Sequence, residues 1–292
     1  MPDDESALRD LERVPLGLPT GLELEWLGVA GYRLSYEGAT VLVDPYVSRV
    51  PIRAVLLRRP TLPDAALLDR YVARADAVLI GHTHWDHAVD APAIARRDGA
   101  AVYGSDSLAR LMALHGLPSV VVEPHRRYEI GPFVVSFTPS RHSKLLFGRK
   151  VPFDGPLTCE DLHGLSPGAY KCGAVYGIRI EVAGIALYHQ GSADLDDAAL
   201  GHAPVDVFLA GVAGRQVTPY YWRRILPRLD PRVVVPTHYD NFFAPLDRPL
   251  TLVRRVDLSG LPDEIAAVSG ATTLAAVPRD PGRPRATPES RT

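Results

Sequence analysis

Cysteine and long apolar runs are scarce in this chain, and each scarcity excludes a class of protein. The 292 residues include two cysteines, Cys159 and Cys172, too few for a small scaffold held together by disulfides. No stretch of about 18 consecutive apolar residues occurs, so we expect no transmembrane segment. Residues 1–17 are acidic and contain no apolar run, which predicts that no signal peptide is present. These features favour a cytoplasmic protein.

The charge of the chain is nearly balanced. Lys and Arg total 32 and Asp and Glu total 34, which gives a formal net charge of −2. Such a balance offers no electrostatic reason to expect nucleic acid or an anionic membrane as a partner. We therefore expect a small-molecule substrate and no nucleic acid, and the sequence leaves the oligomeric state open.

Short β-branched runs alternate with longer segments of helical period, which predicts an α/β domain of mixed sheets covered by helices over residues 1–278. Strands are expected at 22–28, 32–36, 40–44, 76–80, 101–104, 119–123, 133–138, 175–182, 185–189, 206–210 and 232–236. Helices are expected at 64–75, 91–97, 105–115, 195–201 and 219–229.

Two segments lack this alternation. Residues 144–173 contain glycines, prolines and both cysteines without a clear period, which predicts an insertion or a long loop of the kind that often binds ligands. Within it Arg149, Lys150 and Lys171 could contact an anionic group or simply be solvated. Residues 279–292 have almost no apolar side chain and are predicted to form a disordered tail.

Four potential metal ligands follow one apolar strand within six residues. His82 and His84 lie two apart, so that in extended chain they point to the same side, while Asp86 and His87 are adjacent and diverge. One histidine after a strand is usually structural, and Asp86 could cap a helix. Three histidines and an aspartate crowded together in this way favour metal binding, because imidazole and carboxylate suit a divalent ion such as zinc.

The H-x-H-x-D-H pattern at His82–His87 resembles the signature of the metallo-β-lactamase superfamily. The strand ending in Gly28 and the Asp44-Pro45 pair after the third strand are also similar, and the resemblance spans roughly residues 22–245. It implies an αββα sandwich, with two mixed sheets packed face to face and helices outside. The similarity is greatest to the branch that contains ascorbate-phosphate lactonases and the phospholipase D acting on N-acyl phosphatidylethanolamine.

The resemblance also implies two further ligands, each after a strand. His142 would complete a first metal site with His82 and His84, and His238 would join Asp86 and His87 on a second. Without the resemblance, the sequence around His142 would indicate a solvated loop residue, and the sequence around His238 would indicate a buried structural residue.

The chain departs from the family pattern at the carboxylate that bridges the metals. The family has Gly-Asp after a strand, but here Ser192 follows Gly191 and the next carboxylate is Asp194. Asp194 could reach the metals through a reshaped turn, or it could cap the helix expected from residue 195. Both alternatives stay open at this point.

Other candidates are weaker. Asp44 could orient a ligand histidine or simply occupy a turn, and His189 could support the site or belong to the core. Cys159, His163 and Cys172 are spaced too irregularly for a convincing metal site, so a plain loop is favoured.

The expected function is metal-dependent hydrolysis of an ester, lactone or phosphodiester by metal-bound hydroxide, with Asp86 as the catalytic residue that orients the hydroxide and accepts its proton. One or two divalent ions are expected, with zinc favoured over manganese or iron. A non-catalytic metal-binding protein is the main alternative, because Ser192 interrupts the pattern. A di-iron redox enzyme ranks lower, because such relatives usually carry an acidic residue where this chain has His84.

Overall fold

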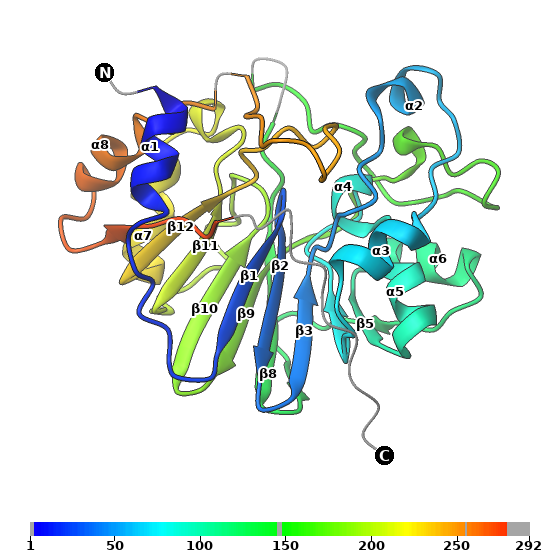
Figure 1. Ribbon diagram of the computed structural model, residues 1–292, viewed down its shortest axis with the longest axis horizontal. Helices are drawn as coiled ribbons and strands as arrows, with labels where there is room; N and C mark the ends of the chain where they lie inside the picture. Colours follow the sequence, from blue (N-terminus) through cyan, green and yellow to red (C-terminus); the bar gives the residue numbers. More distant parts are fainter. Residues whose placement is uncertain (1–2, 145–147, 255, 279–292) are drawn as a thin grey trace.

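The computed structural model describes residues 3–144, 148–254 and 256–278, and the predicted tail at 279–292 lies outside these residues. Two β-sheets pack face to face (Figure 1), and each follows the order of the chain. The six strands of the first sheet are β1 (Glu23–Gly28), β2 (Gly31–Tyr36), β3 (Ala39–Val43), β4 (Ala77–Leu79), β5 (Ala101–Gly104) and β6 (Val120–Val121). The seven strands of the second are β7 (Arg127–Ile130), β8 (Phe133–Ser140), β9 (Val175–Val182), β10 (Ile185–Gln190), β11 (Val207–Gly211), β12 (Val233–Thr237) and β13 (Thr273–Leu274).

Both sheets are mixed. β1–β3 form antiparallel hairpins, and β3–β6 then run parallel. In the second sheet β7–β10 are antiparallel and β10–β13 are parallel. The parallel strands carry almost continuous apolar runs, because sheet or helix covers both of their faces.

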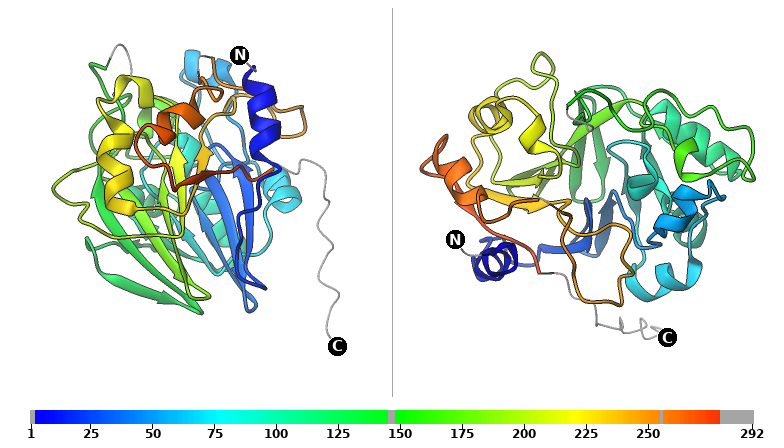
Figure 2. Two further views of the ribbon diagram at one scale, coloured as in Figure 1. Left: turned by 90° about the vertical axis from the view of Figure 1, so that its left-hand side faces the viewer. Right: turned by 90° about the horizontal axis from the view of Figure 1, so that it is seen from above.

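Helices cover the outer faces of the two sheets (Figures 1 and 2). On the side of the first sheet lie α2 (Ile52–Leu56), α3 (Ala65–Tyr71), α4 (Trp85–Ala88), α5 (Ala91–Asp98) and α6 (Asp106–Leu114). On the side of the second lie α7 (Tyr221–Leu229) and α8 (Leu261–Ala266), whereas α1 (Asp4–Leu11) packs at the end of the sheets, where Ala276 N, just after β13, donates to Leu11 O. Short 3₁₀ turns are η1 (Pro167–Ala169) and η2 (Arg215–Val217). No helix in the described part of the chain is long and apolar enough to cross a bilayer.

The period of two in β3 shows how the layers are held together. Val41 and Val43 point inward and share a buried cluster with Phe133 and Val135 of β8, whereas Leu42 points outward into the cluster beneath α5 and α6. The αββα architecture expected from the resemblance is therefore confirmed.

One predicted helix is wrong. Residues 195–201 form a turn in which Asp196 accepts hydrogen bonds from the backbone N–H groups of Ala198 and Ala199. Aspartate that binds nearby backbone N–H groups in this way competes with helix formation. Conversely, α1, α2, α4, α8, β7 and β13 were not predicted; most are short, and their apolar pattern is correspondingly weak.

A buried ion pair joins the two sheets close to the ends of β1 and β12. Arg49 Nη2 lies 2.9 Å from Asp240 Oδ2, both side chains are 1% exposed, and Asp240 Oδ1 accepts from the backbone N–H of Val29. Gly28, at φ +93°, leaves room for the guanidinium, since a Cβ there would lie 1.9 Å from Arg49 Nη2. The loop between β1 and β2 is thus tied to the segment after β12.

Asp240→Ala should therefore destabilise the fold strongly. The substitution leaves the Arg49 cation buried without its partner, and we expect the free energy of unfolding to fall by about 3–5 kcal/mol. Urea denaturation would measure this. Glu123→Ala, which removes a carboxylate from an exposed pair with Arg126, is the matched control and should cost less than about 1 kcal/mol. Equal losses in the two variants would contradict the structural role of the buried pair.

Candidate metal centre

The predicted ligands lie on loops that follow strands of both sheets. β4 leads into His82–His87, β8 into His142 and β12 into His238. Asp44 and Gly191 directly follow β3 and β10, and both lie beside the same cluster. Loops at the ends of strands are held on a rigid scaffold, and this is how side chains distant in sequence come together here.

The first group consists of His82, His84 and His142, which offer ligand nitrogens within 4.8 Å of one another. His82 Nε2 lies 3.1 Å from His84 Nδ1, and the His142 ring lies 4.9 Å from that of His82. The outward nitrogens of two rings are engaged, because His84 Nε2 donates to Pro152 O at 2.8 Å and His142 Nδ1 to Ser143 O at 2.7 Å. These bonds fix the tautomers and leave the inward nitrogens free to bind a cation.

The second group consists of Asp86, His87 and His238. Asp86 Oδ2 lies 3.2 Å from His238 Nε2 and 3.7 Å from His87 Nε2. His238 adopts φ +60° and donates its backbone N–H to Val29 O, which turns the loop toward the cluster. The arrangement offers two imidazole nitrogens and a carboxylate oxygen to one point.

Asp44 orients the second group from behind. Its Oδ2 accepts from His87 Nδ1 at 2.8 Å, and its Oδ1 accepts from the backbone N–H of Gly81 at 2.7 Å. This bond directs His87 Nε2 toward Asp86, as a carboxylate behind a ligand histidine commonly does. His189, in contrast, donates Nε2 to Ala30 O and is fully buried in the core.

Burial and neighbouring charges separate the pKa values of these groups. Burial, reinforced by adjacent imidazoles, holds the pKa of His82 far below its usual value and lowers the pKa of His84 to about 4 and that of His142 to about 3. Burial would also lower the pKa of His87, but the carboxylates of Asp44 and Asp86 outweigh it and raise that pKa. Burial would raise the pKa of Asp86, but the nearby His87 and His238 lower it. The first group is therefore neutral at neutral pH, the form that binds metals.

Of the seven predicted ligands the structure brings six together and leaves Asp194 outside both groups. Asp194 Oδ1 accepts from the backbone N–H of Leu195 and pairs with Arg224 Nη1 of α7 at 3.0 Å. Ser192, at the family's bridging position, instead lines the pocket of the centre, and its Oγ accepts from the backbone N–H of Ser143 at 2.9 Å. The guanidinium of Arg224 explains why Asp194 faces away.

The pocket over the two groups was not predicted. It has a volume of about 490 Å³ and is lined mainly by apolar side chains besides the ligands. Its aromatic residues are Trp85, Phe153, Phe242 and Phe243. Three of these four lie in irregular segments, where no sequence period marks a residue as part of a wall.

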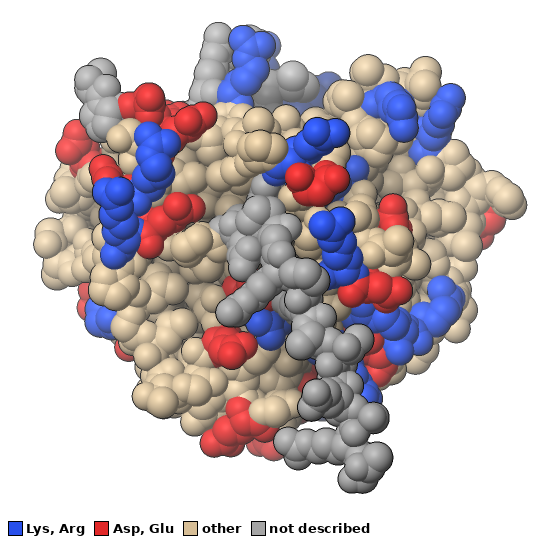
Figure 3. Space-filling view, in the orientation of Figure 1, with Lys and Arg blue, Asp and Glu red and all other residues tan. Residues whose placement is uncertain are grey.

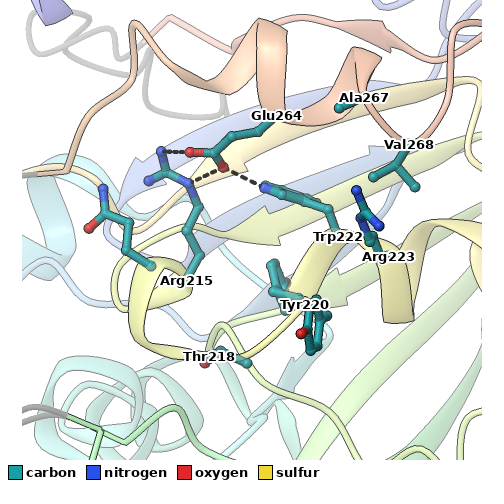
Figure 4. A pocket seen from close by; sticks show the side chains of 10 residues that line it. Arg215, Thr218, Tyr220, Trp222, Arg223, Glu264, Ala267 and Val268 are labelled. Carbon is teal, nitrogen blue, oxygen red and sulfur yellow. Dashed lines mark hydrogen bonds and ion pairs between the residues drawn. The ribbon is translucent and has the colours of Figure 1, made fainter.

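A smaller pocket, of about 250 Å³, lies between η2, α7 and α8 (Figure 4). Glu264 accepts hydrogen bonds there from Trp222 Nε1 and from the Arg215 guanidinium, which also donates to the backbone carbonyls of Val256 and Asp257. These polar groups satisfy one another, so this cluster holds α8 in place. The Cys159, His163 and Cys172 combination forms no ligand group among the described residues, and both cysteines are free.

Comparison with known proteins agrees with this geometry. Residues 23–238 match the family described as "Beta-lactamase superfamily domain". Metal-dependent hydrolases of Carboxydothermus hydrogenoformans and Archaeoglobus fulgidus are 27% and 25% identical to the chain, over 76% and 84% of its length and 86% and 94% of theirs. The chain belongs to the metallo-β-lactamase superfamily. The narrower likeness to the lactonase and phospholipase D branch stays a prediction.

Solved structures share the fold at low sequence identity. A metallo hydrolase from the archaeon Ignicoccus hospitalis superposes with a TM-score of 0.54 at 20% identity, covering 90% of this chain and 96% of its own. The diiron β-hydroxylase CmlA from Streptomyces venezuelae superposes with a TM-score of 0.57 at 15% identity, covering 90% of this chain and 53% of its own. At these identities the likeness concerns the fold alone.

Asp194→Ala should leave the metal content of the purified protein unchanged, because the Asp194 carboxylate is engaged by Arg224. Asp86→Ala, which removes an oxygen from the second group, should lose about one equivalent. Elemental analysis of the wild type and both variants would test this. Loss of an equivalent in Asp194→Ala would instead place that carboxylate in the centre.

If each group holds one ion, acidification should release the two ions in a fixed order. Protons compete more strongly for a ligand whose pKa is raised, so the group containing His87 should lose its ion before the group of His82, His84 and His142. Dialysis from about pH 8 to about pH 5, followed by metal analysis, would show two steps, the first from the Asp86 group. Asp86→Ala and His142→Ala variants, each lacking a ligand of one group, would show which group produces each step. Loss of both ions in one step, or earlier loss from the group of His82, His84 and His142, would refute this.

Proposed function

We propose that this member of the metallo-β-lactamase superfamily, a metal-dependent hydrolase, cleaves an ester, lactone or phosphodiester bond with one or two divalent ions, zinc being favoured. His82, His84 and His142 would hold one ion, and Asp86, His87 and His238 the other. The supporting observation is that imidazoles from three separated segments present inward nitrogens to common points while other protein groups bind two of the outward ones. Nitrogen and carboxylate oxygen donors suit zinc, and also manganese and iron.

Bound divalent cations would lower the pKa of water toward neutrality and stabilise negative charge that develops on the substrate oxygen. The chain supplies the remaining parts of the reaction. Asp86 stays ionised because its pKa is lowered, so its carboxylate is available to accept a hydrogen bond from the attacking water and orient it. The apolar walls of the pocket exclude bulk water, which strengthens the electrostatic interactions inside.

Two alternative functions would require different residues at the metal centre. A di-iron redox enzyme on this fold would be favoured by an acidic residue at position 84, where this chain has a histidine whose Nδ1 faces His82. A non-catalytic metal-binding protein would be favoured by the serine at position 192. The open pocket beside the ligand groups favours catalysis over simple metal storage, because it gives a substrate access to them.

The test is hydrolysis of aryl esters, lactones and bis(p-nitrophenyl) phosphate by purified protein, before and after chelation and after return of zinc, manganese or iron. His142→Ala should lower kcat/KM by more than about 100-fold because it removes a ligand nitrogen. His202→Ala changes an exposed histidine outside both groups and should retain activity. A fully metallated protein that cleaves none of these substrates would refute the proposal and favour the non-catalytic alternative.

A further inference from the structure

A second cavity adjoins the pocket of the metal centre, and Phe153 lines both. This cavity has a volume of about 510 Å³ and lies between the α2 region and the irregular segment that follows Phe153. Its polar lining includes Arg58, Lys171 and the hydroxyls of Thr158 and Ser166. No carboxylate lines it in the described part of the chain.

The two cations of this cavity lack counterions. Arg58 is exposed and Lys171 half-buried, and neither side chain forms an ion pair or hydrogen bond with another described residue. Arg97, Arg215 and Arg224, in contrast, are all paired with carboxylates. Basic side chains also gather without acidic neighbours over α2, at the upper right of Figure 3. In a protein of net charge −2, such a local excess favours an anionic ligand.

Hydrogen bonds fix the wall between the two cavities to the ligand loop. Pro152 O accepts from His84 Nε2 at 2.8 Å, Phe153 O accepts from Cys172 N at 2.9 Å, and Cys172 O accepts from Thr83 N at 2.9 Å. The segments that carry Phe153 and Lys171 are therefore bound directly to the loop that carries His82 and His84.

The Phe153 ring packs against neighbouring groups. Its centroid lies 5.5 Å from that of Trp85 and 6.4 Å from that of His84. A Cβ at position 168 would lie 3.3 Å from Phe153 Cε1, so Gly168 lets the ring approach the backbone. A ring held in this way presents a stable apolar surface that a ligand can cross.

We propose that the cavity lined by Arg58 and Lys171 is a subsite for an oxyanion, a carboxylate or a phosphate, at the far end of the substrate. The connecting part of the substrate crosses Phe153, and the scissile bond lies at the metal centre. This assignment of substrate class rests on the proposed function, and it predicts that the enzyme selects elongated anionic substrates over neutral ones.

The test compares pairs of p-nitrophenyl esters of linear dicarboxylic acids of graded length. In each pair the far end is either a free carboxylate or its methyl ester. At the chain length that spans Phe153, we expect the wild type to prefer the carboxylate by about tenfold or more in kcat/KM, since charge-assisted hydrogen bonds discriminate at least this strongly. Arg58→Met/Lys171→Met should cleave the two esters with similar kcat/KM.

Arg149→Met/Lys150→Met is the matched control. It removes the same two charges from exposed positions of the same region that line neither cavity, so the preference should persist. The subsite would be overturned if the control lost the preference for the carboxylate, or if the wild type cleaved the neutral ester without showing that preference. Either result would leave the hydrolase proposal intact.

A binding measurement separates this inference from failure of the proposed function. If no ester is cleaved, calorimetry with ω-phenylalkanoates and their primary amides still tests the subsite. The wild type and the Arg149→Met/Lys150→Met control should bind the carboxylate about tenfold more tightly than the amide. Loss of this difference only in Arg58→Met/Lys171→Met would support the subsite. Equal binding of acid and amide by the wild type would refute it.

Discussion

The carboxylate of Asp44 is the point on which the geometry of the metal centre depends. It joins the end of β3 to the backbone of Gly81, where the ligand loop begins, and to the ring of His87 within that loop. The second sheet approaches the Asp44 carboxylate closely at Gly191, because a Cβ at that position would lie 2.8 Å from Asp44 Oδ2. A larger residue at position 191 would thus separate the sheets at the centre. Burying this charge is tolerable only because hydrogen bonds satisfy both of its oxygens.

The proposed ligands come from loops of both sheets, so metal binding and packing of the sheets would depend on each other. The loop that holds His238 is tied to the β1–β2 loop by the bond from His238 N to Val29 O and by the pair of Arg49 and Asp240. Val29 and Arg49 are far from His238 in sequence, yet their contacts help to hold the loop in which the ring of His238 faces Asp86. A cation shared between the sheets would in turn oppose their separation, because metal binding stabilises the folded state that forms the site.

Local patterns in the sequence predicted an α/β domain of mixed sheets, and the spacing of His82, His84, Asp86 and His87 is itself a ligand geometry. The αββα sandwich and the ligands His142 and His238 were predicted only through the resemblance to the superfamily, because each of these histidines lies alone in its segment. The position of Asp194 was not predictable, because its partner Arg224 lies on a helix thirty residues later in the chain. The aromatic wall was missed for a similar reason: Phe153 and Phe242 acquire their role from tertiary contacts with Trp85.

The proposed function and the proposed subsite thus assign the chemistry and the recognition of substrate to different parts of the chain. Strand ends fix the ligands, while the irregular segment around Phe153 and Lys171 supplies walls and charge through a few backbone hydrogen bonds. Side chains on that segment can change without moving a ligand, because the bonds that anchor it use backbone atoms of Pro152, Phe153 and Cys172. Selection for a new substrate would then act on this segment first, since substitutions there leave the orienting contacts of Asp44 and the convergence of the imidazoles unchanged.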